Sequence, residues 1–268
     1  MRGLAVAHLT ALDLEPVALV REAGRAGFAS VGLRLHPVMA GALAYPMAVG
    51  SQALRDLKAV MEWEGVAVSD IEFVSLTPER VVAGLEPLLA AGAELGAVSL
   101  TVSGDDADAA RLADNFGALC VLASRYGLRV DLEFMRWRQV GNLHQALDVL
   151  EAAGQANSSV LVDALHLYRS GGDAAAIAAA DPRWFRAVQV CDAPRLAPAE
   201  ALIIAEAREG RLLPGQGELP LAELLGALPD DVGLSVETPS SQLHGEARLK
   251  AAYSATRAWI DRAGLSGF

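Results

Sequence analysis

Lysine is nearly absent from this chain: only Lys58 and Lys250 occur among its 268 residues. No run of lysine and arginine occurs, the formal net charge is −11, and the pI is near 4.9. Nucleic-acid binding needs a basic surface, so this composition argues against a DNA or RNA partner. No uninterrupted apolar run approaches the ~18 residues of a membrane helix, so we also expect no membrane partner.

Cysteine is scarce as well. Cys120 and Cys191 are far apart in the sequence and do not have the spacing of a metal motif. We expect both to be buried apolar residues in a reducing compartment, which favours a cytoplasmic protein. The first residues do not indicate a signal peptide, because Asp13, Glu15 and Pro16 would fall within its apolar region.

Three common catalytic motifs are missing. The chain contains no GxGxxG, no GxxxxGK and no GxSxG sequence. Phosphate binding in a glycine-rich loop and nucleophilic serine chemistry therefore have no support.

Short apolar runs alternate with helical patterns along the whole chain, which predicts a parallel sheet. The length matches the roughly 250 residues of a (β/α)8 TIM barrel. We therefore predict an α/β fold, a TIM barrel with parallel strands that forms one domain over residues 1–268. The expected strands are 3–8, 30–35, 66–74, 97–102, 128–133, 158–163, 186–189 and 232–237. The expected helices include 16–26, 52–64, 77–96 and one ending near Tyr126, with Ser103 or Asp105 as its N-cap.

Four of these strands end on a residue with an oxygen that can bind a hard cation: Glu133, Asp163, Gln189 and Glu237. The carboxyl ends of barrel strands meet on one face, where active sites lie. Three carboxylates and one carboxamide suit Mg, Mn or Co, with Zn possible. The pattern predicts a divalent metal site at this face.

Each of these residues also has a structural interpretation. Glu133 could be a salt-bridged strand end, and because Asp131 is so close we expect only one of the two acids to face the barrel interior. Asp163 could cap the next helix, and Gln189 could be a hydrogen-bonding strand end. Glu237, which is followed by a proline turn, is the least ambiguous.

Other polar residues are candidates for catalysis and substrate binding. His166 follows Asp163 by three residues and is our candidate general acid/base, although it could be a core or surface histidine. Arg208 and Arg211 precede a Pro-Gly turn and could hold an anionic or hydroxylated substrate, or lie on a solvated helix face. Arg34 and His36 end the second strand, beside a 37–50 loop that we expect to shape the substrate pocket.

The segments LEF at 132–134, LVDALHLYRSGG at 161–172, VQVCDAP at 188–194, RLLPGQGELPL at 211–221 and SVE at 235–237 resemble the xylose isomerase-like TIM barrel superfamily. This resemblance implies a divalent metal held by Glu133, Asp163, Gln189 and Glu237. It also implies proton transfer by Glu133 and Glu237, and substrate contact by Arg211. Gln189 departs from the ketose 3-epimerase branch, where histidine is typical. The set Glu, Asp, Gln, Glu is similar to bacterial 3-dehydroshikimate dehydratase, and that branch implies a catalytic role for His166.

These observations favour a metal-dependent isomerase or epimerase acting on a sugar or a related polyhydroxylated carbonyl compound. A base would remove a proton next to a metal-polarised carbonyl. The alternative is a dehydratase of the 3-dehydroshikimate type. An apurinic-site endonuclease is disfavoured by the acidic charge and the five histidines, and a non-catalytic barrel by the retained ligands. We expect a small-molecule substrate as the partner, with homodimerisation possible.

Overall fold

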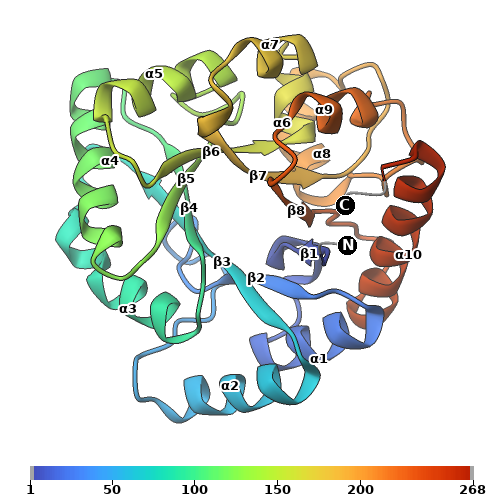
Figure 1. Ribbon diagram of the computed structural model, residues 1–268, viewed down its shortest axis with the longest axis horizontal. Helices are drawn as coiled ribbons and strands as arrows, with labels where there is room; N and C mark the ends of the chain where they lie inside the picture. Colours follow the sequence, from blue (N-terminus) through green and yellow to red (C-terminus); the bar gives the residue numbers. More distant parts are fainter. Residues whose placement is uncertain (1–2, 266–268) are drawn as a thin grey trace.

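Eight parallel strands close into a barrel in the computed structural model, which describes residues 3–265 (Figure 1). Each strand pairs with the next one in the sequence, and β8 pairs with β1 to complete the ring. Helices surround the ring of strands (Figure 1). This architecture confirms the expected (β/α)8 TIM barrel.

The strands are β1 (Ala5–Val6), β2 (Ser30–Arg34), β3 (Ala67–Leu76), β4 (Ser99–Gly104), β5 (Arg129–Glu133), β6 (Ser158–Asp163), β7 (Phe185–Val190) and β8 (Gly233–Val236). The α-helices are α1 (Pro16–Ala26), α2 (Gln52–Glu64), α3 (Glu86–Glu94), α4 (Ala109–Ser124), α5 (Leu143–Ala153), α6 (Ala164–Arg169), α7 (Ala174–Ala179), α8 (Ile203–Glu209), α9 (Leu221–Ala227) and α10 (Gly245–Ala263). Short 3-10 helices are η1 (His8–Ala11), η2 (Val82–Leu85), η3 (Pro182–Trp184) and η4 (Glu200–Leu202).

Three expected boundaries were wrong. The first strand has two residues, because the chain turns into η1 at His8. The helical segment after β3 begins at Val82, not at residue 77. Helix α4 is capped by Asp108, whose side chain accepts from the Arg111 N–H, because residues up to Gly104 still belong to β4.

The apolar core lies between the strands and the surrounding helices. The largest fully buried side chains include Phe116 of α4, Phe185 of β7 and Leu19 of α1. Burial of these apolar side chains, on helices and on strands, holds the helices against the barrel. Among the helices in residues 3–265, none combines the length and apolar character needed to cross a membrane.

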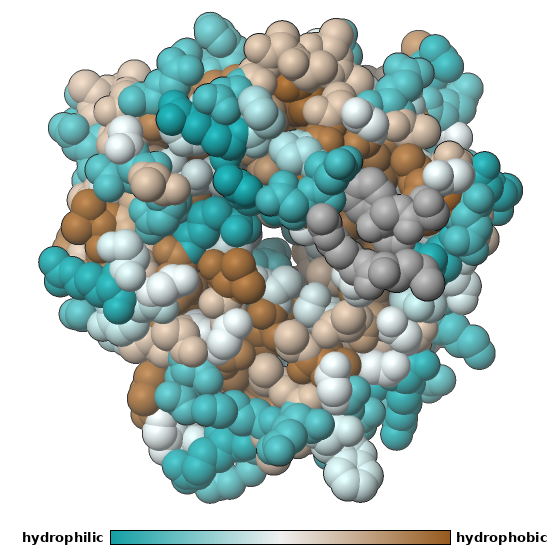
Figure 2. Space-filling view, viewed as in Figure 1, coloured by the Kyte–Doolittle hydropathy of each residue, from teal (hydrophilic) through white to brown (hydrophobic). Residues whose placement is uncertain are grey.

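The barrel interior is more polar than is usual for this fold. Thr101, Asp131 and Ser159 are neighbours in register on β4, β5 and β6, and the Ser159 hydroxyl donates to Asp131 at 2.7 Å. Branched apolar side chains usually fill this space. Polar interior residues leave room along the axis, and the space-filling view shows a hollow at the centre of the molecule (Figure 2).

Candidate active site

A cavity of about 230 Å³ lies at the carboxyl ends of the strands. Strand ends supply its floor, and the segments after β2, β5 and β7 supply its walls. Of the candidate residues from the sequence, it is lined by Arg34, Glu133, His166, Arg208, Arg211 and Glu237. The remaining candidate ligands, Asp163 and Gln189, are not lining residues, but they contact the lining residues Arg211 and Glu237. The fold therefore brings together residues that are 203 positions apart in the sequence, from Arg34 to Glu237.

Glu133, Asp163 and His166 form a group that we call the acid cluster. Each offers one ligand atom, and these three atoms lie within 4.8 Å of one another. All three side chains are buried. His166 Nε2 lies 3.7 Å from Glu133 Oε1, and the backbone N–H of His166 donates to Asp163 Oδ1 at 2.9 Å. Asp163 is thus the cap of α6, as one interpretation predicted, and it is also a member of a cluster that could hold a metal ion.

Arg211 lies among these acids. Its guanidinium pairs with Asp163 Oδ2 and with Glu237 Oε2, the latter at 2.9 Å, and its side chain is only 1 % exposed. The interpretation of Arg211 as part of a solvated helix face was wrong, because α8 ends at Glu209 and the chain turns inward. Arg211 therefore provides a fixed positive charge to two of the candidate metal ligands.

The loop around Arg211 is held by Asp192. Backbone hydrogen bonds link Asp192 and Leu212 in both directions at 2.8 Å, and Asp192 also accepts from the N–H groups of Gly215 and Leu219. A Cβ on Gly217 would lie 2.4 Å from Asp192 Oδ1, so the close approach of this loop requires glycine there. The Pro-Gly segment therefore positions Arg211.

Gln189 lies at the end of β7, beside Glu237. Its Nε2 donates to Glu237 Oε1 at 3.4 Å, while its Oε1 is buried and has no hydrogen-bond partner. A buried carbonyl oxygen without a partner is costly, and a cation would satisfy it. Glu237 does not join the close cluster, because its oxygens face Arg211 and Gln189.

Burial and mutual repulsion set the protonation of the acids. Burial, together with the charges of Glu237 and Asp163, raises the pKa of Glu133 well above its ordinary value. Burial also raises the pKa of Glu237 to about 8, against the opposing effect of Arg211. Asp163 behaves differently: although burial opposes ionisation, Arg211 and His166 hold its pKa low. Burial lowers the pKa of His166 to about 4, so this imidazole is neutral near pH 7.

Other residues complete the pocket. Trp137 packs edge-on against His166 with ring centroids 5.1 Å apart. Glu72 pairs with Arg34 at 3.1 Å, which fixes Arg34 in the pocket wall. Neither Glu72 nor Trp137 is among the site candidates from the sequence; the acid within the apolar run of the third strand was the available indication for Glu72.

The remaining candidate residues differ in their placement. Arg208 is exposed and lines the pocket, and within residues 3–265 no ion pair is found for it. His36 is not a lining residue; its Nδ1 lies 3.0 Å from the Phe73 carbonyl oxygen. Arg138, which the sequence did not single out, lines the pocket, pairs with Asp105 at 2.6 Å and has a buried Nε without a partner.

The expectation that only one of Asp131 and Glu133 faces the barrel interior was wrong. Side chains alternate along a strand, so residues two apart share a face. Glu133 lines the cavity at the carboxyl ends of the strands, and Asp131 lines a second cavity at their amino ends.

The donor set fits a divalent cation. Carboxylates that repel one another, a neutral imidazole and an unpartnered carboxamide oxygen are all groups that a metal ion would stabilise. Glu133 and Asp163 are common to the expected ligand set and to the observed cluster, and Gln189 and Glu237 lie beside them.

A closed parallel barrel with its polar cluster at the carboxyl ends of the strands has the architecture of TIM-barrel enzymes. The chain belongs to the xylose isomerase-like TIM barrel family, which matches residues 20–263. The similar proteins compared below include ones named as an epimerase and as dehydratases.

Two similar proteins are 3-dehydroshikimate dehydratases. That of Pseudomonas aeruginosa is 35% identical over 136 residues, and that of Pseudomonas putida is 30% identical over 139 residues. These matches cover 50% and 51% of this chain, but the chain spans only 21% of either relative.

Solved structures share the fold. The IolI protein with a bound zinc atom has a TM-score of 0.78 at 18% identity, covering 98% of this chain and 99% of that one. D-psicose 3-epimerase from Clostridium cellulolyticum has a TM-score of 0.74 at 15% identity, covering 97% of this chain and 99% of that one.

Proposed function

We propose that this protein is a divalent-metal-dependent enzyme that removes a proton next to the carbonyl group of a hydroxylated, carboxylate-bearing substrate. We propose dehydration of the 3-dehydroshikimate type as the outcome. A divalent ion held by Glu133, Asp163, Gln189 and Glu237 would polarise the carbonyl and stabilise the enolate oxygen. The observation that carries the proposal is Arg208, for which no ion pair is found within residues 3–265 and which lines the same pocket as Glu133 and His166.

Charge complementarity favours an anionic substrate. Arg34 and Arg211 are already paired with acids of the pocket, whereas Arg208 remains available to a carboxylate. The unpartnered Nε of Arg138 offers a second donor. Arginine binds carboxylates through paired, charge-assisted hydrogen bonds, which would orient the substrate ring above the acid cluster.

His166 is suited to accept the proton. It is neutral near pH 7, lies among the candidate ligands and is oriented by Trp137. The proton taken up by His166 would then pass to the hydroxyl group on the neighbouring carbon, which leaves as water while the enolate electrons form a double bond in conjugation with the carbonyl. The similarity to two 3-dehydroshikimate dehydratases supports this outcome.

Epimerisation or isomerisation of a polyhydroxylated ketone is the second candidate. It would begin with the same proton removal and end with reprotonation. Glu133 and Glu237, both of which line the pocket, are the pair of acids that could exchange protons with opposite faces of a substrate. Similarity in fold to D-psicose 3-epimerase supports keeping this candidate.

An assay with 3-dehydroshikimate and a panel of ketoses in deuterated water, after loading with Mg, Mn, Co or Zn, separates the two. We expect metal-dependent loss of water from 3-dehydroshikimate, seen as the absorbance of an aromatic product. Deuterium exchange into a ketose without loss of water would instead establish the second candidate.

The role of Arg208 is tested by Arg208→Gln. Loss of a carboxylate contact should raise KM roughly 10- to 100-fold with a smaller change in kcat. Arg195→Gln is a matched control, because Arg195 is also exposed but does not line the pocket. Equal kinetics for the two variants would exclude Arg208 as the carboxylate contact.

A further inference from the structure

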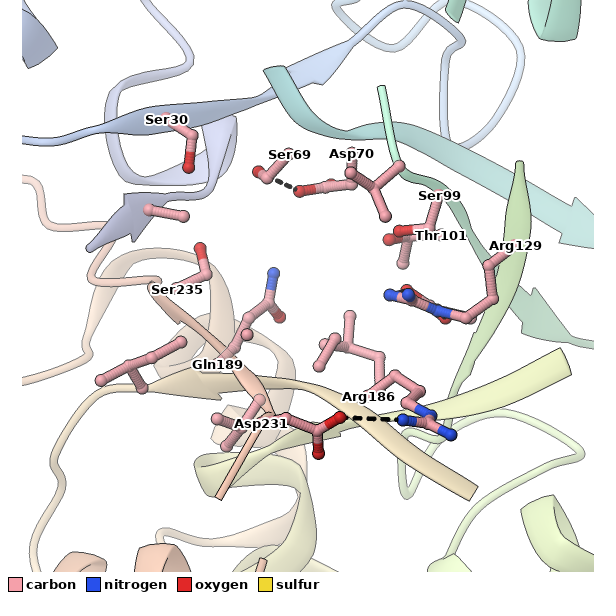
Figure 3. Close-up of a pocket in the computed structure, with 18 of the residues that line it drawn as sticks. Ser30, Ser69, Asp70, Ser99, Thr101, Arg129, Arg186, Gln189, Asp231 and Ser235 are labelled. Atoms are coloured by element: carbon pink, nitrogen blue, oxygen red, sulfur yellow. Dashed lines mark hydrogen bonds and ion pairs between the residues drawn. The ribbon is translucent and has the colours of Figure 1, made fainter. Parts of the chain in front are cut away.

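A second cavity, of about 290 Å³, lies at the opposite end of the barrel, where the strands begin. Hydroxyl and carboxylate side chains from several strands surround it, and Figure 3 shows them arranged around an open centre. Six of them are Ser30, Ser69, Asp70, Ser99, Thr101 and Ser235. We call this space the basal cavity.

Three buried oxygen atoms in the lining of the basal cavity have no hydrogen-bond partner within residues 3–265. They are Asp70 Oδ2, Ser235 Oγ and Gln189 Oε1. Gln189 is only 3 % exposed, and its amide group projects into the open centre in Figure 3. Buried polar atoms are nearly always satisfied by protein, water or a bound ion, so oxygens of this kind around one space mark it as a place where water or a cation binds.

The other charges of the basal cavity are already neutralised. Asp131 is held by Arg129 through two contacts of 2.5 and 2.8 Å. At the cavity mouth, Asp231 pairs with Arg186 at 3.1 Å, as the dashed line in Figure 3 shows. Arg129 and Arg186 are the cationic side chains of the lining, and both are engaged in these pairs.

Asp70 is the exception. Within residues 3–265, the side chain of Asp70 has a single hydrogen bond, which it accepts from the Ser69 hydroxyl at 2.7 Å. Burial, and then the charge of Glu72, raises the pKa of Asp70 to about 7. Among the described residues, Asp70 is therefore the one carboxylate of the lining that is not in an ion pair, and Arg129 only partly offsets the rise in its pKa.

The backbone leaves space for this carboxylate. Gly32 lies opposite Asp70 in the register of β2 and β3. A Cβ on Gly32 would come within 3.0 Å of both Asp70 carboxylate oxygens, so any larger residue would displace them. The neighbouring strand thus accommodates Asp70 in the interior instead of covering it with an apolar side chain.

We propose that the basal cavity binds a small monovalent cation, such as a potassium or ammonium ion, through Asp70 Oδ2 and Ser235 Oγ. One carboxylate together with neutral oxygens matches a single positive charge. Small divalent ions such as Mg²⁺ instead demand a strict octahedral arrangement of their ligands. The volume leaves room for waters to complete the coordination.

The proposal does not depend on the proposed function, because the basal cavity is at the other end of the barrel. Gln189 also lines the basal cavity, but its Oε1 is assigned to the divalent site and is not a ligand in this proposal. The proposal is tested in the presence of a chelator of divalent ions, which removes the catalytic metal from the comparison.

Thermal unfolding near pH 8 in potassium, ammonium, sodium or tetramethylammonium chloride at equal ionic strength tests the proposal. Tetramethylammonium is too large and too apolar to replace the hydrogen-bonding partners of these oxygens. We expect a midpoint about 3–6 °C higher in at least one small cation than in tetramethylammonium. Asp70→Asn should abolish that difference and Ser235→Ala should reduce it.

Asp231→Asn is the matched control, because it removes an acid from the mouth of the same cavity but not from the proposed ligand set. It should keep the full difference between cations. Equal midpoints in all four salts, or a difference that survives Asp70→Asn, would overturn the proposal and leave water as the occupant. An anomalous-scattering peak beside Asp70 in crystals soaked with rubidium ions would support it directly, and absence of that peak would count against it.

Discussion

Replacing Arg211 with glutamine tests how the acids of the active site are neutralised. Arg211 is 1 % exposed and contacts both Asp163 and Glu237, so its removal leaves two buried carboxylates without their cation. Breaking such a buried pair typically costs about 3–5 kcal/mol. For a chain of this size that corresponds to a fall in Tm of roughly 10 °C without metal.

A divalent cation should reverse this loss, because it supplies the positive charge that the substitution removes. We therefore expect Mn or Zn to raise the Tm of Arg211→Gln by more than it raises that of the unaltered protein. Differential scanning fluorimetry with and without metal measures both effects.

Arg169→Gln is the matched control. Arg169 is also buried and pairs with Glu206 at 2.7 Å, but neither residue belongs to the acid cluster. It should lose stability as well, without selective recovery on adding metal. Similar responses of the two variants to metal would refute the reasoning that Arg211 and the metal stabilise the same carboxylates.

Three further predictions concern single residues. Glu237→Gln should lower metal content, measured by elemental analysis after dialysis, and turnover together; unchanged metal and turnover would remove Glu237 from the ligand set. His166→Ala should lower kcat about 10²- to 10⁴-fold while metal stays bound, as expected for loss of a general base, and loss of the folded state would show a purely structural role. Asp70→Asn, in a buffer whose only cation is tetramethylammonium, should stabilise the protein by up to about 4 kcal/mol near pH 8 and little near pH 4. Because the pKa of Asp70 rises from 3.8 to about 7 on folding, the folded chain binds more protons between these values and stability falls as pH rises through them. Denaturant titrations at both pH values measure the difference, and an equal effect at both would contradict the pKa.

The sequence predicted the barrel and the identities of the strand-end residues because both depend on local patterns. Glu133, Asp163 and Glu237 each end an apolar run, and a buried acid in that position is seldom there for packing alone. The pairing of Arg211 with Asp163 could not be predicted, because it depends on the turn of the chain after α8 and on the contacts of Asp192.

Two other features could not be predicted from local sequence patterns. Trp137 lies against His166 only because the segment after β5 folds over the barrel. The basal cavity arises from Asp70 and Ser235, on strands β3 and β8, which look like ordinary polar residues in the sequence. Three-dimensional closure of the barrel is what brings these side chains together.

The measurement that tests the central claim most directly is titration of the metal-depleted protein with Mn or Zn while turnover of 3-dehydroshikimate is followed. The account predicts that turnover appears with the first equivalent of metal and is lost on chelation. Stoichiometric metal binding without turnover of 3-dehydroshikimate or of any ketose would contradict the proposed reaction. Absence of metal binding altogether would contradict the site itself.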